Sequence, residues 1–123
     1  MPINLSQLED LIKANGLKYF KDEEHKLLIL PFRRRMGNAI QILIRIDSEG
    51  QFLQLRSNDL PSLSQSPDLF VLRDLAALNY QKRWIKFGFD PSDGEVVAYG
   101  DMWVMDGHVT VQQIGRMVQN FVG

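Results

Sequence analysis

Apolar and polar side chains alternate strictly between residues 40 and 47. Successive side chains of a β-strand point to opposite sides, so every second residue of this segment would share one face. The residues on the apolar face are Ile40, Ile42, Ile44 and Ile46. The pattern predicts a strand with one buried face and one face largely in contact with water.

Further strands are predicted from shorter apolar runs that are bounded by turn residues. The run 26–32 is apolar on both faces, which is typical of an internal strand. The other runs cover residues 18–20, 52–56, 84–90 and 95–105. Short turns predict that three or four of the strands before the second helix form an antiparallel meander, and an Asp- and Gly-containing stretch at 90–94 predicts a hairpin loop.

Three segments have the apolar spacing of amphipathic helices, at residues 4–16, 66–83 and 110–122. Each begins with a residue type that caps helix N-termini. The predicted caps are Asn4 with Gln7, Ser66 followed by Pro67, and Thr110 with Gln113. Gly16 is expected to end the first helix.

The elements follow one another in the order α-β-β-β-β-α-β-β-α. Strands and helices do not alternate one for one, so a doubly wound parallel sheet is not expected. The prediction is a single α+β domain over residues 1–123, with one antiparallel sheet of five to six strands flanked by helices. No internal repeat or linker divides the chain.

Composition narrows the class of protein. The chain has 123 residues, 14 Lys and Arg against 15 Asp and Glu, and no cysteine. A net charge of −1 disfavours broad binding to nucleic acid. Without cysteine, disulfides and thiolate metal sites are excluded, and a reducing compartment is favoured. The chain begins without a signal-peptide pattern and lacks an apolar run long enough for a membrane span, so a cytoplasmic location is expected.

No catalytic or metal-binding constellation emerges from the residues. His25 and His108 lie beside predicted turns without neighbouring ligands at useful spacing. The acidic stretch 90–95 fails the EF-hand pattern, because its Gly falls at the fifth position. We therefore predict no enzyme, cofactor or metal. One basic cluster, made by Arg33, Arg34 and Arg35, is a solvated turn or a weak anion-binding site.

The second helix has a wider apolar arc than one sheet can cover. Leu69, Leu72, Ala76 and Tyr80 fall on one face, and Val71, Leu75 and Leu78 fall on an adjoining face. Leaving the adjoining face in water would forgo about 1.5–3 kcal/mol per side chain. A second surface is expected to cover the excess: another copy, a bound protein segment, or the first and last helices.

Several short motifs in the second half of the chain resemble the YbjN-like family of bacterial proteins, whose fold is related to that of type III secretion chaperones. They are Leu78-Asn79, Phe87-Gly88-Phe89-Asp90, Asp93-Gly94-Glu95-Val96 and Val109-Thr110, within a match that is best over residues 66–122. The resemblance implies an α+β fold, homodimers, and binding of polypeptide rather than catalysis. It implies no catalytic residues.

The leading functional hypothesis is a homodimer that binds a protein or peptide as a chaperone, adaptor or regulator. Its predicted interface residues are Leu69, Val71, Leu72, Leu75 and Leu78. Trp84 and Trp103 could add interface area, although burial in the core is the stronger expectation for both. The alternative is a domain that senses a small molecule or anion, with Arg33–Arg35 or with Arg45 and Arg56 holding the anion.

Overall fold

The computed structural model describes residues 3–33, 39–57, 69–105 and 108–122. Three α-helices and six strands lie in this part of the chain, in the predicted order. The elements are α1 (Leu5–Ala14), β1 (Phe20–Asp22), β2 (Leu27–Arg33), β3 (Ala39–Asp47), the 3₁₀ turn η1 (Ser48–Gly50), β4 (Phe52–Ser57), α2 (Leu69–Gln81), β5 (Lys86–Phe89), β6 (Val96–Trp103) and α3 (Val111–Val122). The α+β prediction is confirmed.

All six strands form one antiparallel sheet in the order β1-β2-β3-β4-β6-β5. The predicted meander of β1 to β4 is confirmed, and β2 is internal as its two-sided apolar pattern indicated. The long strand β6 connects the two parts of the sheet. Its second half pairs with β4, from Phe52↔Trp103 to Ser57↔Ala98, and its first half pairs with β5.

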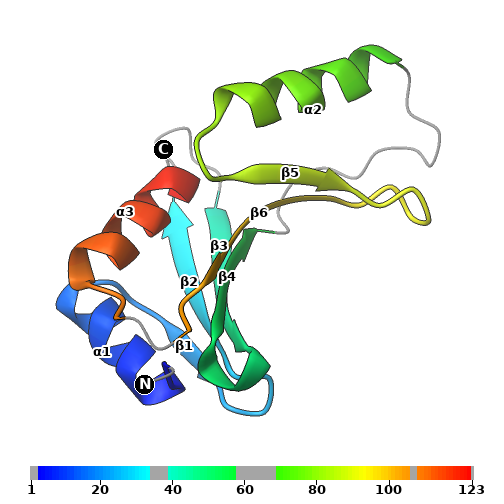
Figure 1. Ribbon diagram of the computed structural model, residues 1–123. Coiled ribbons are helices and arrows are strands. Elements are labelled where there is room, and N and C mark those ends of the chain that lie inside the picture. The colour runs from blue at the N-terminus through cyan, green and yellow to red at the C-terminus, as the bar shows by residue number, and fades with distance from the viewer. Residues whose placement is uncertain (1–2, 34–38, 58–68, 106–107, 123) are drawn as a thin grey trace.

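Helices α1 and α3 lie side by side on one face of the sheet, while α2 stands apart beside β5 (Figure 1). The core lies between α1, α3 and that face. It includes the four alternating isoleucines of β3, which are buried as predicted. Leu8 and Ile12 of α1, Ile42 of β3, and Ile114 of α3 are completely inaccessible to solvent. None of the helices in the described ranges is long and apolar enough to cross a bilayer.

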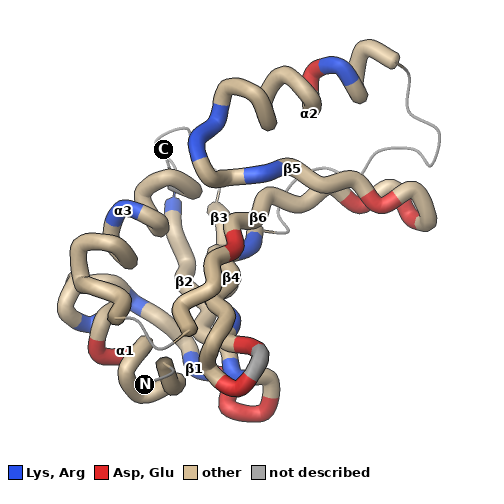
Figure 2. The backbone as a smooth tube through the Cα atoms, viewed as in Figure 1, with Lys and Arg blue, Asp and Glu red and all other residues tan. Residues whose placement is uncertain are grey.

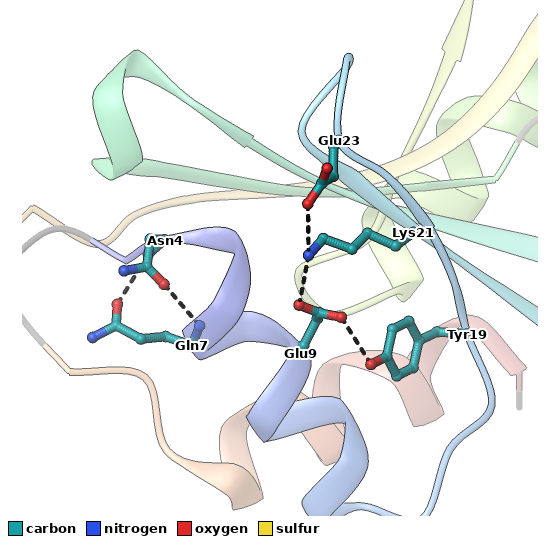
Figure 3. Close-up of polar contacts among 6 residues, drawn as sticks. All are labelled: Asn4, Gln7, Glu9, Tyr19, Lys21 and Glu23. Carbon is teal, nitrogen blue, oxygen red and sulfur yellow. Dashed lines mark hydrogen bonds and ion pairs between the residues drawn. The ribbon is translucent and has the colours of Figure 1, made fainter.

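Two of the predicted helix caps are confirmed. Asn4 and Gln7 form a complete capping box at α1, with Gln7 N donating to Asn4 Oδ1 at 2.8 Å and Asn4 N donating to Gln7 Oε1 at 2.9 Å (Figure 3). Thr110 and Gln113 make the same pair of bonds at α3. Gly16 follows α1 with φ of 69°, which only glycine adopts without strain. Ser66 and Pro67 lie outside the described residues.

Some element boundaries differ from the prediction for identifiable reasons. The first strand begins at Phe20 and extends to Asp22, two residues later at each end than the predicted run 18–20. The fifth strand starts at Lys86, because Trp84 has φ of 72° and interrupts the extended backbone. The sixth strand ends at Trp103, shortly before Met105, whose φ is 53°. The hairpin loop at 90–94 is confirmed, and Gly94 supplies its positive φ of 80°.

A polar cluster fastens α1 to the edge strand β1 (Figure 3). The Glu9 carboxylate accepts a hydrogen bond from Tyr19 Oη at 2.9 Å and pairs with Lys21 Nζ at 3.1 Å. Lys21 Nζ also pairs with Glu23 at 3.0 Å. The bond from Lys21, followed by that from Tyr19, lowers the pKa of Glu9 below its ordinary value. The bonds to Glu23 and Glu9 raise the pKa of Lys21.

Candidate protein-binding surface

Helix α2 has no buried residue, in contrast to α1 and α3. Three of its large apolar side chains, Leu69, Phe70 and Tyr80, are exposed to 70, 71 and 82%. We define the α2 face as Leu69, Leu72, Ala76 and Tyr80, which share one side of the helix and are all exposed. The wide apolar arc predicted from the sequence is therefore left uncovered on this side by the described chain.

The opposite side of α2 is half-buried. Val71, Leu75 and Leu78 recur at helical spacing and are each partly shielded. Strand β5 is the element that α2 mainly contacts. The five predicted interface residues are thus divided by the fold: Leu69 and Leu72 lie on the exposed α2 face, and the other three lie on the half-buried side of the helix.

Asn79 fixes α2 on β5 through two hydrogen bonds to the backbone of Phe87. Phe87 N donates to Asn79 Oδ1 at 2.6 Å, and Asn79 Nδ2 donates to the Phe87 carbonyl oxygen at 3.2 Å. The amide satisfies one donor and one acceptor of the strand, as a neighbouring strand would do. The motifs Leu78-Asn79 and Phe87-Gly88-Phe89-Asp90 are therefore joined in the structure by these two hydrogen bonds.

Sequence reasoning missed the roles of Phe70 and Asn79. Phe70 lies one helical step from Leu69 and enlarges the exposed apolar surface. Its hydrophobicity was visible in the sequence, but its direction depends on where β5 meets the helix. The function of Asn79 had no signal in periodicity, because a polar residue near the end of a helix usually faces water.

The two tryptophans have different environments. Trp84 packs against the core, with its ring 6.0 Å from that of Phe121, and its Nε1 donates to the Asp101 carbonyl oxygen at 3.3 Å. Trp103 is 63% exposed and touches Phe52, with ring centroids 4.9 Å apart. The expected core burial is wrong for Trp103, because its position on β6 faces the side of the sheet away from α1 and α3.

The arginine candidates do not converge on one site. Arg33 ends β2 and is exposed, whereas Arg34 and Arg35 lie outside the described residues. Arg45 and Arg56 line a separate pocket of about 240 Å³ on the sheet face that α1 and α3 leave open. Arg56 Nη2 pairs with Glu95 at 2.9 Å.

His25 lies in the turn between β1 and β2 and bonds to Asp22 there. Its Nδ1 lies 2.9 Å from Asp22 Oδ2, and its backbone N–H donates to Asp22 Oδ1. These bonds hold the pKa of Asp22 below its ordinary value. The described ranges contain no group of three His, Cys, Asp or Glu side chains that could hold a metal ion.

Two known structures share this arrangement. The crystal structure of YbjN from E. coli, "a putative transcription regulator", superposes with a TM-score of 0.68 at 18% identity, over 95% of this chain and 82% of that one. A chain of the ExsC–ExsE complex superposes with a TM-score of 0.61 at 19% identity, over 98% and 88%. These similarities confirm the predicted α+β fold. No curated protein matches the chain in sequence.

The sequence also matches a family model across nearly its whole length. The matched residues are 4–123, and the model is that of YbjN, "Putative bacterial sensory transduction regulator". The match extends the resemblance seen in the second half of the chain to α1 and the meander. The chain belongs to the YbjN family.

Proposed function

We propose that this protein is a non-catalytic, cytoplasmic homodimer that binds another protein as a chaperone, adaptor or regulator. The observation that carries the proposal is the exposed α2 face on a helix with no buried residue. Fully burying a leucine-sized side chain contributes about 1.5–3 kcal/mol. A dimer in which a second copy covered Leu69 and Leu72 would therefore be stabilised by this burial.

A homodimer is the simplest way to cover this face. In a twofold dimer the same patch meets itself, so an apolar patch is automatically complementary to its partner. Family membership and the similarity to a chain of the ExsC–ExsE complex, which contains two different proteins, support a role in protein binding. Phe70, at the margin of the α2 face, extends the apolar area that such a contact can use.

Sedimentation velocity of the Leu72→Glu variant tests the dimer. At tens of micromolar, we expect the molar mass derived for the wild-type protein to be twice the 14.2 kDa of one chain. The variant is expected to have the mass of a single chain. A charge placed in the contact would have to be desolvated without a partner. Because Leu72 is exposed in the monomer, the variant is expected to keep its circular dichroism spectrum.

The matched control is Val111→Glu. Val111 begins α3 and is 41% exposed, close to the 39% of Leu72, but it lies away from α2. This variant is expected to remain dimeric. A wild-type protein with a measured mass of 14.2 kDa would contradict the proposal. The proposal would also be contradicted if both variants lost the dimer to the same extent.

A second candidate function is anion sensing at the pocket formed by Arg45 and Arg56. The two guanidinium groups line one pocket together with the apolar side chains Leu27 and Leu43. Thermal-shift assays with phosphate, nucleotides and carboxylates test it. A saturable rise in melting temperature that Arg45→Ala abolishes would favour this function, and no shift with any of these anions would reject it.

A further inference from the structure

A second surface, distinct from the α2 face, lies between α3 and the turn that joins α2 to β5. It is an open groove of about 810 Å³. Trp84 and Met102, which are partly exposed, supply apolar surface, and Arg83 and Arg116 supply positive charge. In Figure 2 basic residues mark both the α2–β5 turn and α3. Pockets of this size accommodate peptide segments and small ligands.

The two arginines come from separate elements and are both exposed. Neither guanidinium has an ion-pair partner in the described part of the chain. The one carboxylate lining the groove, that of Asp101, accepts a hydrogen bond from Gln54 Nε2 at 2.9 Å. Among the described residues, the groove therefore presents two guanidinium groups without an ion-pair partner against a single carboxylate. Guanidinium groups bind carboxylates in a forked, two-bond geometry.

Trp84 is held in this groove at a conformational cost. Its φ is 72°, and Ile85 N donates to the Arg83 carbonyl oxygen at 2.8 Å, which closes a strained γ-turn around it. A Cβ on Gly100 would lie 2.6 Å from the Trp84 ring, so only glycine permits this close packing. Strained residues often mark ligand sites because the surrounding structure must hold them in place.

The polar side of α3 adds neutral hydrogen-bonding groups. Gln112 and Gln119 both line the groove, and neither side-chain amide is held by a hydrogen bond within the described ranges. Seven residues of helix separate them, or about 10 Å along the axis, which corresponds to about three residues of extended chain. Side-chain amides can donate to and accept from a peptide backbone, as Asn79 does with Phe87.

We propose that this groove binds an extended acidic polypeptide segment. Its carboxylates would pair with Arg83 and Arg116, its backbone would bond to the amides of α3, and an apolar side chain would rest on Trp84 and Met102. Met side chains adapt to differently shaped partners, which suits a polypeptide site. The inference rests on the proposed protein-binding function and assigns the bound partner to a surface other than the α2 face.

Fluorescence anisotropy with a defined probe tests the groove. The probe is a fluorescein-labelled decapeptide in which glutamate and leucine alternate, and the protein carries Trp103→Phe so that Trp84 is its only tryptophan. We expect saturable binding, a change in Trp84 emission, and weaker binding as salt rises. The double variant Arg83→Ala/Arg116→Ala is expected to raise the dissociation constant at least about tenfold.

The matched control is Lys18→Ala/Lys26→Ala, which removes the same charge from exposed positions on either side of β1, outside the groove. It is expected to bind the probe like the parent protein. A probe with lysine in place of glutamate should not bind. The inference is overturned if the acidic probe fails to bind, if both double variants lose equal affinity, or if the lysine probe binds as well.

Sedimentation velocity on the same samples separates the two proposals. Loss of probe binding in the Arg83→Ala/Arg116→Ala variant with an intact dimer supports the groove and leaves the α2 contact standing. A dimeric wild-type protein that does not bind the probe overturns the groove alone. A monomeric wild-type protein that binds the probe through these arginines overturns the dimer alone.

Discussion

The part of the sheet formed by β1 to β4 carries α1 and α3, whereas the part formed by β5 and the start of β6 carries only α2 (Figure 1). Both helical layers are rich in apolar residues. In the first, Ile12 and Ile114 are completely buried, and in the second no helical residue is buried. The comparison teaches that apolar content alone does not create a core: a helix needs a surface on two sides to bury a wide apolar arc.

The largest expected effect distinguishes the core from the α2 face directly. Ile114→Ala should lower the free energy of unfolding by about 2–5 kcal/mol, because it leaves a cavity in a fully packed site. Leu72→Ala should cost less than about 1 kcal/mol in dilute, monomeric protein, since its side chain is already exposed. Urea denaturation measures both. Equal losses at low protein concentration would contradict the comparison.

The junction between the two regions depends on the contact of Trp84 with Gly100. Gly100→Ala should cost about 1–3 kcal/mol, because the new methyl group would overlap a rigid ring held against Phe121. Thermal unfolding and Trp84 emission in the Trp103→Phe background measure the change. Gly88→Ala is the control, since its nearest contact is the movable Tyr99 ring at 3.1 Å. A variant as stable as the parent would refute this role of Trp84.

Asn79 is expected to hold α2 on the sheet without stabilising the core. Asn79→Ala removes two hydrogen bonds to β5, which together are worth about 2 kcal/mol. Hydrogen exchange should accelerate in α2 and remain unchanged in α1 and α3. Asn120→Ala is the matched control, because the Asn120 side chain donates to the Arg116 carbonyl oxygen of its own helix and not, among the described residues, to another element. Uniform acceleration along the chain would show that α2 is not an independent unit.

The smallest expected effect is the pH dependence of the Glu9 cluster. The pKa of Glu9 is lowered from 4.5 in the folded protein, so its stabilising contribution is present above that value and is lost as the pH falls through the lowered pKa. The difference in melting temperature between wild type and Glu9→Gln should therefore shrink between about pH 6 and about pH 3. A difference that grew as the pH fell would have the wrong sign.

Local sequence patterns predicted well the region in which α1 and α3 cover the sheet. The isoleucine alternation of β3, the capping boxes of α1 and α3, and the positive φ at Gly16 each depend on a few neighbouring residues, and all are confirmed. Local sequence could not predict that β6 rather than β5 lies next to β4, because pairing between distant strands has no short-range signal.

The candidate surface was predictable only in part. The width of the apolar arc indicated that α2 would need a second surface, but periodicity could not say which side β5 covers. Trp103 was expected in the core, yet its register opposite Phe52 places it on the open face. The groove beside Trp84 combines residues from the α2–β5 turn, β6 and α3, so it exists only once the fold brings them together.

Disulfide trapping tests most directly the claim that a second copy covers the α2 face, because the chain contains no cysteine of its own. The single variants Leu72→Cys and Ala76→Cys each place a thiol on the α2 face. As a control, Gln119→Cys places a thiol at an exposed position of α3. In a twofold contact centred on the α2 face, the residues beside the axis lie near their own copies, within the short reach of a disulfide. The account predicts covalent dimers on oxidation of at least one α2 variant and none of Gln119→Cys. If both α2 variants remain single chains under the same conditions, the claim is contradicted.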